Sequence, residues 1–492
     1  MPTAVPPTPT VAQPKSEGKI TIVSGVEPET LEYHMAYSRE QALPLRNVTE
    51  ALLNRDPKTN DLIGEMATKW EQTNPTTWRF TLRKDVKFHN GEALDAEGAA
   101  WITNRNWKKE NNFGIRQFIG PELTAKAVDP LTLEITTAAP DPILPFRMYF
   151  STIAAAKHAQ ANPEELPTKP IGTGPYKLVE WIKGQYIKMT ANENYWGGPP
   201  KIKDVVFNFR KESAVRVAMI QTGEADLARL VNPEDCKKAP ACISAPSAET
   251  LFLRIDTPHA ALKDLRVRKA MAAAIDTPSI LSQILAGEGI LAAQLVNPIV
   301  NGHNPALKPY AYNPDEAKKL MDEAKAAGVP TNSPLEVILR AGRFARAEEA
   351  TEALSNMINK VGFNSKVKIM DVAQERAYGQ VRPAPPERGG LLFRYHGNEI
   401  GDSSASISSY YRCDGTLSTY CNPKVDEMDT KARVLTGAER TKAYQEIWKV
   451  VYDDVAVIPM VHVGISYAFS KKLTWNPRID GFILVKDVTL AK

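Results

Sequence analysis

The side chains of this sequence that could carry chemistry are acids, histidines and cysteines, and their spacing gives catalysis little support. There is no G-x-S-x-G nucleophile turn, no H-E-x-x-H metal helix and no phosphate-binding loop. The neighbouring acids Asp453-Asp454 and Glu348-Glu349 fit solvated helix charges better than an acid–base pair. The seven histidines are scattered, and a metal site would require the fold to bring His34, His89 and His396 together. We therefore expect no enzyme, no cofactor and no metal centre.

The four cysteines form two close pairs along the chain, Cys236 with Cys242 and Cys413 with Cys421. An even number of cysteines in local pairs predicts two small-loop disulfides in an oxidising compartment. The sequence alone permits three connectivities. A zinc site is the alternative, but the C-x5-C and C-x7-C spacings differ from the usual ligand spacings.

The composition is typical of a soluble globular protein large enough for two or three lobes, with 492 residues, 43% hydrophobic and 24% charged. The net charge of +4 comes without any basic run, which argues against nucleic-acid binding. Residues 1–18 are rich in Pro, Thr and small polar residues and lack the apolar segment of a signal peptide. We expect a disordered tether of a mature exported protein, or of a lipoprotein in which Met1 replaces a lipidated cysteine. An ordinary disordered tail is the alternative.

The first half of the chain reads mostly as β-structure. Residues 176–182, 186–190 and 205–209 alternate like strands, with Lys183-Gly184 as a tight turn between the first two. Residues 78–83 and 131–136 alternate in the same way. The remaining expectations are a buried strand at 20–24, a short helix over 46–54 and a helix over 95–109.

The second half reads as an α/β lobe, because helices and strands alternate. Asn313-Pro314 starts a helix that stops at Gly328, and Pro278 breaks a helix expected over 264–286. Thr436 opens a capping box for a helix that runs to about residue 451. The other expected elements are strands at 335–339, 367–370 and 455–461 and a helix over 348–361.

Six motifs in this order resemble the extracellular solute-binding proteins of the peptide/dipeptide/nickel type, which serve bacterial ABC importers. They are WRFTLR with VKFHNG at 78–91, GTGPY at 172–176, NYWGGPP at 194–200, GEAD at 223–226, DLRVRKA at 264–270 and NPKVD at 422–426. The resemblance implies an α/β, two-lobed Venus-flytrap fold with an extra inserted domain. Domain I would comprise residues 19–49, 175–262 and 470–492, the β-rich domain II residues 50–174, and the α/β domain III residues 263–469. Chain crossings near Pro258 and Ser470 would form the hinge.

The same resemblance places a ligand between domains I and III. At the domain I edge, residues 29–35 supply Glu29, Tyr33 and His34. At the domain III edge, residues 391–411 supply a larger set: Tyr395, His396, Asn398, Glu399, Asp402 and Ser403. Peptide-binding members carry Trp-x-x-Asp-x-x-Asp-Pro there, in which one Asp pairs with the peptide α-amino group. Tyr395 takes the Trp position, and Asp402 is the best match to that Asp. The spacing is one residue longer, and Ser403 replaces the Pro.

Arginines after the strand at 335–339 could hold a ligand carboxylate, because a guanidinium binds a carboxylate through two parallel hydrogen bonds. They are Arg340, Arg343 and Arg346, and a basic loop surface is the other interpretation.

The resemblance implies a monomeric receptor in the periplasm or outside the cell, lipid-anchored to the membrane surface. It would capture a small solute, in the first place a short peptide, and deliver it to the ABC permease subunits of the cytoplasmic membrane. The alternatives are a non-peptide solute (an oligosaccharide, an opine-like conjugate or a chelated metal), a peptide hydrolase, and an adhesion or scaffold protein with the same fold.

Overall fold

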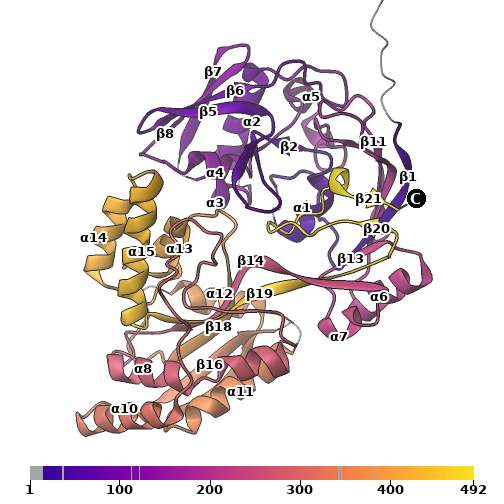
Figure 1. The fold of residues 1–492 in the computed structure, drawn as a ribbon. Coiled ribbons are helices and arrows are strands. Elements are labelled where there is room, and N and C mark those ends of the chain that lie inside the picture. Colours follow the sequence, from indigo (N-terminus) through magenta and orange to yellow (C-terminus); the bar gives the residue numbers. More distant parts are fainter. Residues whose placement is uncertain are drawn as a thin grey trace, which may run out of the picture.

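Two long antiparallel strands connect the two lobes of this mixed α/β fold (Figure 1). They are β14 (Ala241–Ile255) and β19 (Val457–Phe469), and each contributes to the sheets of both lobes. The computed structural model describes residues 15–35, 38–111, 113–120, 122–341, 344, 346–381 and 383–491. The expected tether at 1–18 therefore lies mostly outside the described residues, and β1 already begins at Glu17.

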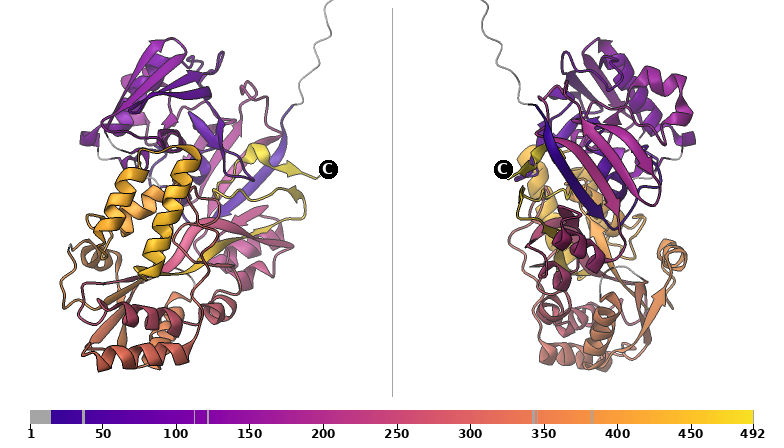
Figure 2. Two further views of the ribbon diagram at one scale, coloured as in Figure 1. Left: turned by 60° about the vertical axis from the view of Figure 1, so that its left-hand side comes forward. Right: turned by 90° about the vertical axis from the view of Figure 1, so that its right-hand side faces the viewer.

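The sheet of domain I has the strand order β10-β11-β12-β1-β13-β19. Its strands, which face the viewer in Figure 2 (right), are β1 (Glu17–Ser24), β10 (Tyr176–Ile182), β11 (Tyr186–Ala191), β12 (Ile202–Phe209) and β13 (Leu227–Arg229). The predicted turn between β10 and β11 is confirmed, and Gly184 has φ 77° there. Helix α6 (Ser213–Thr222) ends at Gly223, which is also left-handed (φ 78°). The end of the chain returns to this lobe as β20 (Leu473–Thr474), which pairs with β21 (Thr489–Leu490).

Domain II is a four-stranded antiparallel sheet with helices packed beside it (Figure 1). Its order is β5 (Ala67–Asn74), β6 (Thr77–Leu82), β8 (Thr132–Thr137), β7 (Leu123–Asp129). The predicted helix over 95–109 is α2 (Ala96–Trp107), which Asp95 caps by accepting from the Gly98 amide at 2.7 Å. The smaller elements are α3 (Arg116–Ile119), α4 (Leu144–Met148) and α5 (Ala156–Ala161).

The helix expected over 46–54 is wrong. Helix α1 occupies Arg39–Leu45 instead, and the chain then extends through β2 (Glu50–Ala51) and β3 (Leu53–Arg55). β2 pairs with β9 (Thr152–Ile153) and β3 with β4 (Leu62–Gly64). The cause is tertiary: Asn47 donates to the Ile483 carbonyl at 3.0 Å, and the buried Glu50 accepts from Tyr195 and Trp196. Contacts with residues far along the chain therefore outweigh the local helical pattern.

Domain III continues the same sheet in the order β15-β19-β14-β18-β16-β17. Its own strands are β15 (Gly289–Leu291), β16 (Pro334–Arg340), β17 (Asn364–Met370) and β18 (Gly390–Gly397), of which β16 runs parallel to β17 and β18. The helices around it are α8 (Leu265–Ala274), α9 (Thr277–Ser279), α10 (Pro314–Ala326), α11 (Ala347–Asn359), α12 (Val372–Gln380), α13 (Ser403–Tyr410), α14 (Pro423–Ala432) and α15 (Gly437–Asp453).

Most of the helix starts and breaks predicted for this lobe are confirmed. Asn313 caps α10 by accepting from the Glu316 amide at 3.1 Å, and the helix broken at Pro278 ends at Ala274 before the short α9. Thr436 is the N-cap residue of α15, but its side chain makes no capping hydrogen bond, so the expected capping box is absent at this described helix.

The core packing places the hinge inside β14 and β19. Ala245 and Ile465 pack in the core shared by domains I and II, whereas Leu251 and Val463 pack in the core of domain III. The β14–β19 register is also irregular between Pro246 and Thr250. Both crossings therefore come earlier in the chain than the positions expected near residues 258 and 470, because the strands run unbroken through both lobes. Within the described residues, none of the helices has the length and apolar character to span a lipid bilayer.

Candidate functional site

A cavity of about 730 Å³ lies between the two lobes, outside the carboxyl ends of β16, β18 and the domain III part of β19. This edge is where ligands of open α/β sheets bind. The lobe of domains I and II, which is the upper lobe in Figure 1, lines the cavity with Ser38, Arg39, Phe118, Arg229, Leu230, Val231, Asn232, Pro233, Glu234, Ile465 and Ser466. Those that line it from domain III are Glu249, Ile284, Leu285, Ala286, Glu288, Arg340, Phe344, Arg346, Tyr395, Glu399, Val463 and Gly464.

An aromatic wall covers the domain III side of the cavity. The rings of Phe344 and Tyr395 are tilted with centroids 5.2 Å apart, and Phe393 packs edge-on against Phe344 at 5.7 Å. Tyr395 lies in β18, so the sheet fixes its backbone. Such walls supply apolar contact area in small-molecule sites, where a few polar groups fix the orientation.

Of the three expected arginines, Arg340 and Arg346 line the cavity, and Arg343 lies outside the described residues. Arg346 is occupied, because it donates to the Glu349 carboxylate at 2.7 Å and to the Gln283 carbonyl at 2.7 Å. Arg340 is partly buried at the end of β16, and within the described part of the chain its guanidinium has no hydrogen-bond or ion-pair partner. Arg340 can therefore bind a ligand carboxylate without breaking an internal contact.

Glu399 reaches the cavity but is held by the opposite lobe. Its carboxylate forms an ion pair with Arg39 of α1 at 3.4 Å, and both side chains are largely buried. Arg55 of β3 donates to the carbonyls of Glu399 (3.1 Å) and Ile400 (2.9 Å). The loop after β18 is thus tied to the upper lobe by two arginines.

Asp402, expected to bind a ligand amine, is fully buried and already has five donors. Arg440 donates to its carboxylate at 2.7 and 2.9 Å, Asn301 at 2.9 Å, and Ser404 through its amide (3.0 Å) and its hydroxyl (2.6 Å). Burial opposes ionisation, but the Arg440 guanidinium and the other donors hold the pKa of Asp402 below its usual value. This placement corrects the expectation: Asp402 is the N-cap of α13, and no face of its carboxylate is left for a ligand. Ser403 beside it donates to the Asn301 carbonyl at 2.7 Å.

The other candidates of this strand lie just behind the cavity wall. His396 is buried with Nε2 2.7 Å from the Ser406 hydroxyl, and burial lowers its pKa to about 3, so the ring is neutral. Asn398 is buried too and donates to the Leu295 carbonyl at 2.9 Å. Both side chains fix the end of β18 and do not line the main cavity.

The stretch 29–35 does not form the domain I wall. Glu29 is exposed outside the cavity, and Tyr33 is buried in the core. His34 is buried with Nε2 3.0 Å from Asn106 Nδ2 and 3.1 Å from the Thr152 carbonyl, and burial lowers its pKa to about 3. The expected ligand roles of these three residues are therefore corrected to surface and core positions. Among the described residues, no group of three or more His, Cys, Asp or Glu side chains could hold a metal ion.

The actual domain I wall is the segment 229–234, which sequence reasoning missed. Leu230 is 41% exposed and left-handed (φ 54°), a backbone conformation that is unusual for leucine, and Pro233 opens α7 (Pro233–Cys236) beside it. These residues carry no motif. The one sequence feature that could have indicated this wall is Cys236, because its disulfide with Cys242 connects the segment to the start of β14.

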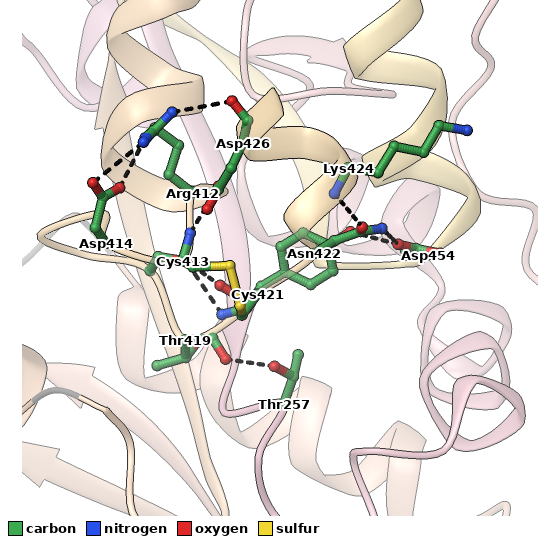
Figure 3. Close-up of a disulfide and its surroundings, with 12 residues drawn as sticks. Thr257, Arg412, Cys413, Asp414, Thr419, Cys421, Asn422, Lys424, Asp426 and Asp454 are labelled. Carbon is green, nitrogen blue, oxygen red and sulfur yellow. Dashed lines mark hydrogen bonds and ion pairs between the residues drawn. A yellow bond between two sulfur atoms is a disulfide. The ribbon is translucent and has the colours of Figure 1, made fainter. Parts of the chain in front are cut away.

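Both expected disulfides are present, Cys236–Cys242 and Cys413–Cys421. The second closes the loop between α13 and α14, where the Cys413 amide donates to Asp426 at 3.0 Å and Arg412 forms an ion pair with Asp414 at 2.8 Å (Figure 3). The first fixes the cavity wall, whereas the second fixes a surface loop away from it.

Comparisons with known proteins agree with this architecture. The profile of the bacterial extracellular solute-binding proteins, family 5 (middle), matches residues 61–416. The dipeptide-binding protein of Escherichia coli (strain K12) is 26% identical over 448 residues, which cover 82% of this chain and 81% of that protein. The glutathione-binding protein GsiB of the same strain is 24% identical over 454 residues, with 87% and 86% covered. The solved structure of the ABC transporter substrate binding protein CtaP from Listeria monocytogenes matches with a TM-score of 0.86 at 20% identity, covering 97% of this chain and 100% of that one, which confirms the two-lobed fold.

Proposed function

Because this chain belongs to the bacterial extracellular solute-binding proteins of family 5, we propose that it captures a short peptide between its lobes and delivers it to an ABC permease. Similar proteins are named for a dipeptide and for glutathione, which is itself a small peptide. The observation that carries the proposal is the cavity between the lobes, with its aromatic wall and the guanidinium of Arg340, which has no hydrogen-bond or ion-pair partner among the described residues. A guanidinium can bind the terminal carboxylate of a peptide through two parallel hydrogen bonds.

Hinge closure supplies the mechanism. The cavity takes lining residues from both lobes, so a bound peptide contacts both only when they are close together. A ligand that binds the closed arrangement better shifts the population toward it. Micromolar affinity needs about −8 kcal/mol net, which a few hydrogen bonds, one ion pair and the burial of apolar side chains supply.

The family consists of solute-binding proteins rather than enzymes. We assign the chain no catalytic step, and hydrolysis of a mixed peptide library by the purified protein would contradict this. The proposal takes a single copy as the binding unit, since one chain contributes lining residues from both lobes. The Pro- and Thr-rich residues 1–18 have the composition of a spacer between a lipid anchor and a domain, so we include lipid attachment in the proposal. Metabolic labelling of the protein with a fatty acid in its native cell tests it.

The decisive experiment identifies the solute that the protein carries. The protein is purified without ligand, incubated with an extract of peptides and sugars, washed, denatured, and the released molecules are measured by mass spectrometry. We expect a series of short peptides. Release of a sugar, an opine or a metal chelate without any peptide would overturn the peptide assignment.

A further inference from the structure

Two of the four acids that line the cavity already interact within the protein. Glu399 is paired with Arg39 at 3.4 Å. Glu249 also makes an interaction within the protein. A ligand ammonium group that bound to Glu399 or Glu249 would compete with that existing contact. Glu234, on the lobe of domains I and II, is exposed, so water screens its charge.

Glu288 is the fourth acid, and its carboxylate has no hydrogen-bond or ion-pair partner among the described residues. It is partly buried, and burial raises its pKa to about 7, with no cation among the described residues to offset the lost hydration. Its backbone is fixed, since its carbonyl accepts from the Gly464 amide at 3.4 Å. At Gly289 (φ 131°), a Cβ would come within 2.4 Å of the His462 carbonyl, so only glycine fits there. The fold therefore holds the Glu288 carboxylate at the cavity, next to β19, with no described cation to compensate its charge.

Glu288 and Arg340 lie at opposite ends of the sheet edge that forms the cavity floor. Glu288 precedes β15, and Arg340 ends β16, with β19, β14 and β18 between them. Four strand-to-strand steps of about 4.8 Å place the two backbones on the order of 20 Å apart. Both side chains shorten this gap, so an extended peptide of about three to five residues, rising about 3.4 Å per residue, would span it.

We propose that Glu288 binds the α-ammonium group of the peptide. The peptide then lies along the sheet edge, with its amino terminus beside β19 and its carboxylate at Arg340. The assignment rests on the proposed function, since it presumes a peptide ligand. It moves the amine site away from the loop after β18, whose acids Glu399 and Asp402 are neutralised by Arg39 and Arg440.

The test compares free-amine and N-acetylated peptides. Two tetrapeptide pools of identical random composition, one free and one N-acetylated, are titrated against the purified protein, and apparent Kd values are taken from the concentration dependence of Tm. The variants are E288Q, E399Q and the control E352Q, which removes one exposed charge from domain III outside the cavity. E288D keeps the charge and serves as a second probe of the site.

We expect the wild type and E352Q to prefer the free-amine pool by roughly 10- to 100-fold, the range of a charge-assisted hydrogen bond. E288Q should lose this preference, E288D should retain part of it, and E399Q should retain it. Equal binding of both pools by the wild type, or loss of the preference in E399Q but not in E288Q, overturns the amine site and leaves the peptide receptor intact. Binding of neither pool overturns the proposed function itself.

Discussion

Replacing Asp402 by Asn should destabilise domain III without changing which peptides the protein prefers. Asn has nearly the same shape and keeps an oxygen that can cap α13. It cannot neutralise Arg440, whose side chain is only 4% exposed and which pairs with the carboxylate at 2.7 Å. The change therefore leaves one buried charge without its partner, which is the costly way to break a buried ion pair.

The expected loss is about 3–5 kcal/mol in the free energy of unfolding. Guanidinium titration followed by circular dichroism measures it. The control is D453N, which breaks the exposed Lys449–Asp453 pair (2.7 Å, side chains more than half exposed) and should change stability by less than about 0.5 kcal/mol. Adding R440M to D402N should recover part of the loss, because methionine removes the orphaned charge and still fills the space.

The ligand readout separates this structural role from an amine site. D402N should weaken binding of free-amine and N-acetylated peptides by the same factor. A loss of stability below about 1 kcal/mol, together with a selective loss of free-amine binding, would refute the assignment of Asp402 as a buried cap.

Three further predictions follow from the cavity and its walls. The preference for free-amine over acetylated peptides should fall as pH drops from ~8 to ~6, because protonation of Glu288 (pKa about 7) removes the charge that attracts the ammonium. Isothermal titration calorimetry at several pH values measures the preference, and a preference that does not change with pH would contradict this. Replacing both Cys236 and Cys242 by Ser should lower the free energy of unfolding by about 2 kcal/mol and weaken peptide binding, because the disulfide fixes the cavity wall at 229–234. Thermal denaturation with and without reductant measures the loss of stability, and the variant should match the reduced wild type. Arg39→Ala should open the ligand-free protein, since it removes the inter-lobe pair with Glu399, and an unchanged radius of gyration in small-angle scattering would argue against that.

The sequence was most informative where structure is set by neighbours in the chain. The β10–β11 hairpin was predicted because Gly184 supplies the left-handed turn between two alternating strands. The start of α10 was predicted because Asn313 is a typical N-cap residue, and its side chain accepts a hydrogen bond from the Glu316 amide three residues ahead. The helix expected over 46–54 failed because Glu50 and its neighbours are satisfied by residues more than a hundred positions away.

The candidate site was predicted only in part, for the same physical reason. Tyr395 and Arg340 line the cavity as expected, because Arg340 ends β16 and Tyr395 lies near the end of β18, and the carboxyl ends of these strands form the cleft. The burial of Asp402 depends on Arg440, which comes 38 residues later on another helix. Glu288 carries no motif and reaches the cavity only because β15 pairs with β19. No local pattern could reveal either partnership.

The central position of β19 has a consequence for how the protein reaches its native state. This strand lies between β13 and β14 in domain I and between β15 and β14 in domain III, yet only the last part of the chain follows it. Neither lobe can complete its sheet during synthesis until residues 457–469 are available, and pairings of such long sequence separation are slow to form. Folding should therefore finish only after the whole chain has been made, with an incomplete sheet edge exposed in both lobes until then. A truncation before residue 457 should leave two incomplete domains rather than one intact and one missing.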